Sequence, residues 1–208
     1  MAEDHEPVEE GSLSEVVEET RGIQPWRRAF HATNGTLLVL ALGVFGLEVS
    51  LALPILGGIL VFMLVLDGLR LLDPKVNVLF FRAFASLASP REATKIASST
   101  WYAISAFLVL LLFPKAYALA GILVLAWGDP AANLVGRRWG RIPFLAGTVL
   151  GTATFLLVAF LALVLFVPWW IALVTAAVTA VVEAAAVDLD DNLIVPLTAA
   201  VVLFLIAG

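Results

Sequence analysis

The sequence predicts an all-α protein, a polytopic membrane helix bundle with about seven transmembrane helices. Of its 208 residues, 62% are hydrophobic, and the mean hydropathy is +1.02. Soluble domains are usually about half apolar. A helix needs about 20 apolar residues to span a bilayer. We expect one membrane domain over 25–208. Seven apolar segments within it approach that length: 31–47, 49–69, 98–113, 116–135, 144–167, 169–187 and 192–208.

The first 24 residues have a different composition and predict a disordered acidic tail. Eight of the 17 acidic residues lie in the first 20 positions. This stretch lacks the apolar region of a signal peptide, and only 13–17 suggests a short helix. The chain contains no cysteine, which excludes disulfides and thiolate chemistry.

The basic residues predict the orientation of the bundle. If the loops alternate sides, eleven of the twelve lie on the side of the N-terminus, and only Lys115 lies on the other. This asymmetry places the N-terminus in the cytoplasm. The eleven are Arg21, Arg27, Arg28, Arg70, Lys75, Arg82, Arg91, Lys95, Arg137, Arg138 and Arg141.

The connection between the second and third segments predicts a short interfacial amphipathic helix. Apolar residues recur at helical spacing from Val76 to Leu87, with Lys75, Asn77 and Arg82 on the opposite face. Such a helix could guide a lipid or simply anchor the chain. The sequence Ser-Pro-Arg-Glu at 89–92 then resembles a capping box, in which the glutamate side chain caps a helix start.

Asp129 lies inside an apolar segment, where ionisable groups are costly. Because Pro130 disfavours helical geometry at the residue before it, we expect a helix break with Asp129 as the N-cap of a new helix. Asp129, Asn133 and Arg137 would share one face, and Gly136 would permit a close approach by a ligand or a helix. A capped, kinked helix without a ligand is the alternative.

Two further polar clusters lie at ends of apolar segments. Glu183 precedes a loop, and Asp191-Asn192 opens the last segment; carboxylates of this kind suit Mg²⁺ and its phosphate ligands. Asp188 and Asp190 read as solvated loop residues. The other cluster, 27–35, holds Arg28, His31 and Asn34. A basic membrane anchor would account for its arginines but not for His31 or Asn34.

At these residues the chain resembles the family of dolichol kinases, phytol kinases and CTP-dependent diacylglycerol kinases. Five elements match in order, from about residue 27 to residue 200. They are Arg27-Arg28-x-x-His31-x-x-x-Gly35, Asp67-Gly68-Leu69-Arg70, Arg91-Glu92, Gly128-Asp129-x-x-Ala132-x-x-x-Gly136-Arg137-x-x-Gly140, and Glu183 with Asp191-Asn192-x-x-x-Pro196. The chain departs from the family at 143–148, where Gly147 is kept but the family's lysine and glutamate are absent. Arg138 or Arg141 could supply the missing charge.

The resemblance implies a cytoplasm-facing kinase that moves the γ-phosphoryl group of CTP to a membrane lipid alcohol with Mg²⁺. No P-loop motif occurs in the chain, and no nucleic-acid partner is expected. Asp129 and Asp191 would hold the metal, and Glu183 or His31 would act as the base. The remaining candidates would bind the nucleotide, the arginines as phosphate clamps: Arg28, Asn34, Arg70, Asn133, Gly136, Arg137 and Asn192.

Several alternatives stay open at this stage. A cytidylyltransferase making a CDP-lipid uses a similar Gly/Ser-Asp element. A small anion transporter could bind its substrate with broken helices. Dolichol, phytol, geranylgeraniol and diacylglycerol all fit as the acceptor.

Overall fold

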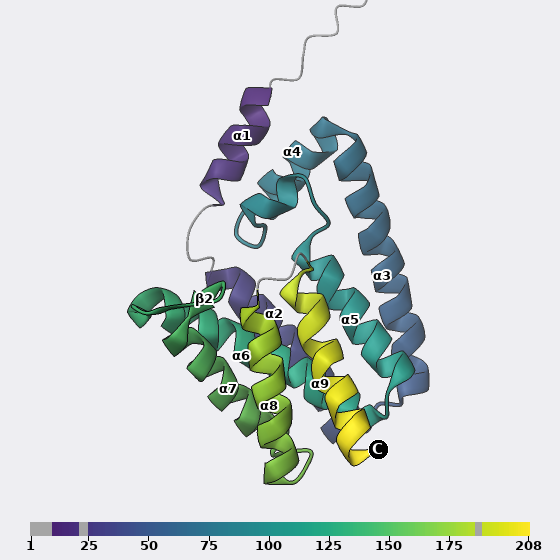
Figure 1. The fold of residues 1–208 in the computed structure, drawn as a ribbon. Helices are drawn as coiled ribbons and strands as arrows, with labels where there is room; N and C mark the ends of the chain where they lie inside the picture. Colours follow the sequence, from purple (N-terminus) through teal and green to yellow (C-terminus); the bar gives the residue numbers. More distant parts are fainter. Residues whose placement is uncertain (1–9, 21–24, 186–188) are drawn as a thin grey trace, which may run out of the picture.

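The computed structural model describes residues 10–20, 25–185 and 189–208. The described residues form an all-α protein with one small hairpin (Figure 1). The α-helices are α1 (Glu10–Glu19), α2 (Pro25–Val39), α3 (Val49–Leu72), α4 (Pro74–Ala83), α5 (Ser98–Leu112), α6 (Lys115–Trp139), α7 (Val149–Leu163), α8 (Trp169–Ala184) and α9 (Asp191–Ala207). The hairpin pairs β1 (Pro143–Phe144) with β2 (Gly147–Thr148).

Each of the seven predicted apolar segments coincides with a helix, and the first continues from α2 into a π-helical turn, Leu40–Val44. By length and composition, α3 and α6 could cross a membrane, whereas α5, α7, α8 and α9 are shorter apolar helices. The two long helices differ in their surroundings: most of α6 is buried within the protein, whereas only Ala52, Asp67 and Arg70 of α3 are buried. Seven membrane crossings therefore stay a prediction.

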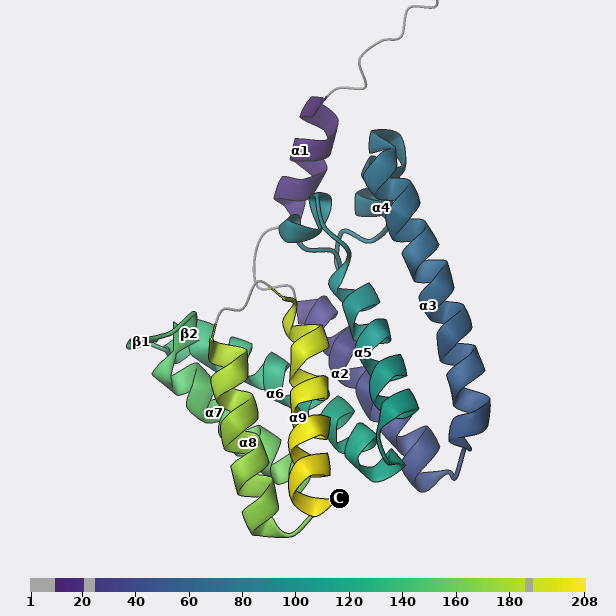
Figure 2. The ribbon, with the colours of Figure 1, turned by 45° about the vertical axis from the view of Figure 1, so that its right-hand side comes forward.

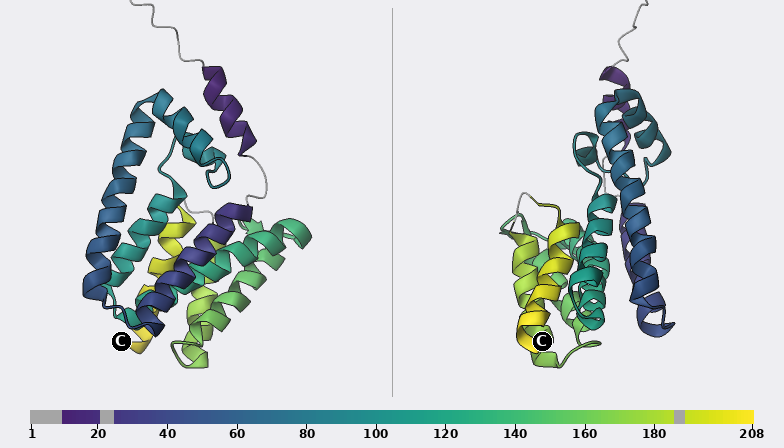
Figure 3. Two further views of the ribbon diagram at one scale, coloured as in Figure 1. Left: turned by 180° about the vertical axis from the view of Figure 1, so that it is seen from behind. Right: turned by 90° about the vertical axis from the view of Figure 1, so that its right-hand side faces the viewer.

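The core surrounds α6, which packs against α2, α5, α7 and α9. Small residues allow this crowding. A Cβ added at Gly121 would lie only 2.6 Å from the backbone oxygen of Pro196 on α9. Helix α3 lies outside this bundle and packs against α5 (Figure 3). The bundle thus presents α6, with Asp129, to several helices at once.

The expected helix break at Asp129 is wrong, because α6 is continuous from Lys115 to Trp139 and contains Pro130. A proline removes one backbone donor from the helix. Helix α6 packs on α2, α7 and α9, and tertiary packing of this kind commonly overrides a local helix propensity. The segment expected to begin at 144 also starts later, since a hairpin precedes α7. Thr148 caps α7 by accepting a hydrogen bond from the Gly151 amide, 3.1 Å away.

The N-terminal region also differs from the expected disordered tail, because Glu10–Glu19 forms α1. The predicted short helix at 13–17 lies within it; residues 1–9 and 21–24 lie outside the described part of the chain. Val16 packs with Phe81 of α4 and with Ala88. Figure 2 shows α1 beside α4 at one end of the bundle. The apolar side chains of this otherwise acidic segment therefore pack α1 against α4.

The predicted amphipathic helix exists as α4, but its faces are not those expected. Asn77, which we placed on the polar face, is buried together with Val78 and Phe81, whereas Leu79 is exposed. The burial of Asn77 is explained by its hydrogen bonds, which sequence spacing could not reveal.

Candidate functional site

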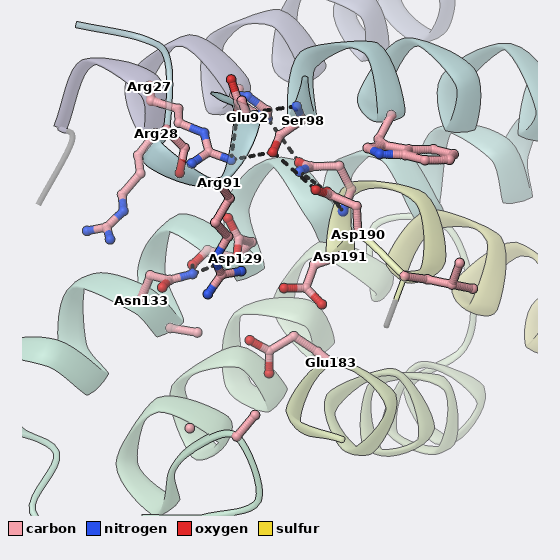
Figure 4. Close-up of a pocket in the computed structure, with 18 of the residues that line it drawn as sticks. Arg27, Arg28, Arg91, Glu92, Ser98, Asp129, Asn133, Glu183, Asp190 and Asp191 are labelled. Carbon is pink, nitrogen blue, oxygen red and sulfur yellow. Dashed lines mark hydrogen bonds and ion pairs between the residues drawn. The ribbon is translucent and has the colours of Figure 1, made fainter. Parts of the chain in front are cut away.

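One cavity of about 1140 Å³ collects most of the predicted site residues (Figure 4). It lies where α2, α5 and α9 begin and α8 ends, with α6 and the hairpin forming further walls. Its charged lining residues are Arg27, Arg28, Arg91, Glu92, Lys95, Asp129, Arg137, Glu183, Asp190 and Asp191. Carboxylates and cations brought together from distant parts of the chain make this the candidate functional site.

Asp129 and Asn133 face the cavity from one side of α6. The Asn133 side-chain amide donates to Asp129 Oδ1 at 2.6 Å and to the Asp129 backbone oxygen at 3.1 Å. Asn133 therefore orients the carboxylate one helical turn away. Gly136 lines the cavity too, but it also serves packing, since a Cβ there would lie 3.2 Å from the Cα of Gly151 on α7.

The start of α9 is held by a hydrogen-bond network around Asp190. The Asp190 carboxylate caps the helix by accepting from the Asn192 amide at 3.0 Å, and it accepts from Ser98 Oγ at 3.1 Å. It also accepts from the Asn192 side chain at 2.5 Å. Asp190 is thus not the solvated loop residue we expected, while Asp188 lies outside the described residues.

His31 and Asn192 are joined in the cavity wall. The Nδ1 atom of His31 lies 3.1 Å from Asn192 Oδ1, and the His31 ring meets the Tyr102 ring edge-on, with centroids 5.2 Å apart. His31 is buried. These contacts fix the imidazole between α2, α5 and α9.

Glu92 joins α2 to the start of α5, and its carboxylate also accepts from the Ser89 backbone, which is the glutamate half of the expected capping box. Its Oε1 atom lies 3.5 Å from Arg27 Nη2 and accepts from the Ser98 amide at 3.3 Å. Arg27 also donates to Ser98 Oγ at 2.6 Å. Ser89 makes no side-chain cap, because the helix there, Pro90–Ala93, is a single 3-10 turn. Burial raises the pKa of Glu92, while Arg27 and the Ser98 hydrogen bonds oppose that shift.

Asp129, Glu183 and Asp191 all point into the cavity (Figure 4). They come from α6, the last turn of α8 and the first turn of α9. Among the described residues, no three acidic or histidine side chains lie close enough to hold a metal ion by themselves. The donor set nevertheless fits Mg²⁺, which proteins commonly bind through one or two carboxylates together with substrate phosphates.

The cations are arranged around these carboxylates. Arg28 has a buried Nη1 atom without a hydrogen-bond partner among the described groups. Arg91 extends toward Asp191 and Asp129 (Figure 4). A buried guanidinium donor needs an acceptor, and a phosphate oxygen would supply one. The cavity therefore combines carboxylates with cationic side chains, a set that suits a metal-bound polyphosphate.

Two predicted site residues do not line the cavity: Asn34 and Arg70. Arg70 is only 1% exposed, and its guanidinium donates hydrogen bonds to Asp67 and to two backbone oxygens of the protein. Conversely, sequence reasoning gave no site role to Arg27, Glu92, Ser98 or Asp190. The signals that could have pointed to two of them are the family-like pairs Arg27-Arg28 and Arg91-Glu92.

Sequence comparison shows similarity to two kinds of lipid kinase. CTP-dependent diacylglycerol kinase 1 of Schizosaccharomyces pombe is 27% identical over 201 residues, which cover 86% of this chain and 92% of the yeast protein. The phytol kinase of Synechocystis is 38% identical over 99 residues, or 41% of this chain and 42% of that protein. CTP-dependent diacylglycerol kinase 1 of Eremothecium gossypii is 32% identical over 117 residues, which cover 56% of this chain and 36% of that protein. No family model and no solved structure matches the chain.

Proposed function

This chain belongs to the family of CTP-dependent diacylglycerol kinases and phytol kinases, and we propose that it transfers the γ-phosphoryl group of CTP to the hydroxyl of a membrane lipid alcohol. One observation carries the proposal. Four of the five family-like elements, separated by up to about 160 residues in sequence, line one cavity: 27–35, 91–92, 128–140 and 183–192. The fifth, 67–70, lies outside the cavity, and its Arg70 donates a hydrogen bond to the backbone oxygen of Glu92 in the loop between α4 and α5.

In the proposed complex, Asp129 and Asp191 hold Mg²⁺ with the triphosphate of CTP. The metal would neutralise charge on the phosphates. Arg28, Arg91 and Arg137 line the same cavity and would bind phosphate oxygens. Phosphoryl transfer relies chiefly on such positioning and charge stabilisation.

Glu183 is the proposed base for the lipid hydroxyl. Its carboxylate faces the cavity and makes no hydrogen bond to another described residue. His31, the other candidate, already contacts Asn192 through Nδ1, so we propose that it positions the start of α9. Asn133 and Asn192 likewise orient Asp129 and Asp190.

A labelling experiment tests the function. The purified protein, given CTP labelled in the γ-phosphate and Mg²⁺, should convert diacylglycerol, phytol or dolichol into a labelled lipid phosphate. CTP labelled in the α-phosphate should leave the lipid unlabelled. Transfer of the α-label would instead identify a cytidylyltransferase. A protein that labels no lipid with either substrate would refute the kinase assignment.

We propose further that the membrane domain, 25–208, crosses the bilayer seven times with the cavity and the N-terminus in the cytoplasm. The eleven-to-one distribution of basic residues supports this orientation. Single cysteines can be introduced into the cysteine-free chain at 82, 115, 138 and 168. An impermeant thiol reagent should label positions 115 and 168 in intact cells, but 82 and 138 only after lysis. Labelling of 138 from outside would overturn the arrangement.

A further inference from the structure

Arg70 lies on α3, outside the cavity, and all three nitrogen atoms of its guanidinium donate hydrogen bonds to other groups of the protein. Its Nε atom donates to Asp67 Oδ1 at 2.5 Å. Nη1 donates to the backbone oxygen of Glu92 at 2.5 Å, and Nη2 to that of Lys95 at 2.7 Å. The face of the guanidinium lies 4.6 Å from the centroid of the Phe80 ring. One side chain of α3 thus binds the loop between α4 and α5 at two points.

Two neighbours of Arg70 extend its hold on the same loop. Asp67 Oδ2 accepts from the Ala97 amide at 3.1 Å and from Thr100 Oγ1 at 2.6 Å. The Asn77 side-chain amide donates to the Ala93 backbone oxygen at 2.8 Å. Asp67, Arg70 and Asn77 are all nearly inaccessible to solvent. Together they satisfy backbone groups at 92, 93, 95 and 97.

This loop needs such support because it has little regular structure. Only Pro90–Ala93 forms a helical turn, so the backbone groups that follow need partners from elsewhere. The same loop supplies three charged residues to the cavity: Arg91, Glu92 and Lys95. The network therefore sits directly behind one charged wall of the site.

We propose that Arg70, paired with Asp67, is a positioning residue that holds loop 90–97 so that Arg91 and Lys95 face the phosphates of the donor nucleotide. This inference rests on the proposed kinase function. A guanidinium is suited to the task because its fixed planar fork serves several acceptors at once. A lysine at 70 would keep the charge but could not reach Asp67, Glu92 and Lys95 with the same geometry.

Two variants test the inference, Arg70→Lys and the milder Thr100→Val, which removes only the 2.6 Å hydrogen bond to Asp67. Each variant should raise the rate of backbone amide hydrogen exchange in residues 90–97, while the amides in the core of α6 stay protected. Arg70→Lys should raise the KM for CTP about tenfold, with kcat and the KM for the lipid nearly unchanged. Arg82→Lys, an exposed arginine on α4, is the matched control and should change neither measurement.

A double-mutant cycle with Arg91→Ala separates positioning from general stability. If Arg70 acts through the loop, Arg70→Lys should raise the KM for CTP much less in the Arg91→Ala background than in the wild type. Additive effects on KM, or unchanged exchange in 90–97, would overturn the inference. If Arg70→Lys does not fold, Thr100→Val carries the same two readouts. A wild-type protein without transfer activity would refute the kinase function, and the exchange data would still decide whether Arg70 holds the loop.

Discussion

Asp129→Asn should insert and fold normally but lose phosphoryl transfer by roughly 10²-fold or more. The amide keeps the size of the side chain. It can still contact Asn133, whose Nδ2 atom lies 2.6 Å from Asp129 Oδ1 in the wild-type protein. It removes the negative charge that we assign to the metal-bound triphosphate. The loss should therefore appear in kcat/KM for CTP, with little change in thermal stability in detergent.

Asp73→Asn provides the matched control for this variant. Asp73 is exposed, caps α4 by accepting from the Lys75 amide, and does not line the cavity. Asparagine is as good a cap as aspartate, so this acid-to-amide change should leave activity near wild type. Near wild-type activity in Asp129→Asn as well would remove Asp129 from the site and leave it a structural role only.

Glu183→Gln and Asp191→Asn should each lower turnover by a similarly large factor, roughly 10²-fold. The two residues come from consecutive helices and point into the same cavity (Figure 4). Because one would accept the hydroxyl proton and the other would hold the metal-bound triphosphate, both act on the same transition state. The double variant should then be little slower than the slower single variant, since residues that act as a unit are strongly non-additive.

Thermal stability distinguishes this role from a structural one. Glu48→Gln, which changes an exposed glutamate before α3, is the control and should be fully active. If the acidic cluster were only a polar helix junction, removing a half-buried charge should stabilise the protein and leave turnover intact. Active, more stable variants at both 183 and 191 would therefore contradict the proposed site.

The sequence alone was enough to predict most of the helices, and nine of the eleven predicted site residues line the cavity. The apolar segments form helices at nearly the expected positions, because a helix satisfies the backbone groups of its own segment internally. Carboxylates and amides inside those segments, such as Asp129 and Glu183, stood out because hydrocarbon disfavours them. Both line the cavity in the structure.

Only the tertiary structure decided which partner each polar residue takes. Arg70 was expected to bind phosphate, yet its guanidinium donates hydrogen bonds to Asp67 and to two backbone carbonyls of the loop. Glu92 was expected to cap a helix start, and it does bond the Ser89 backbone, but it also contacts Arg27, 65 positions earlier in the chain. Pro130 predicted a break, yet α6 continues through it and packs on several other helices. Local spacing reports contacts within a turn or two of helix, whereas these interactions depend on which helices the fold brings side by side.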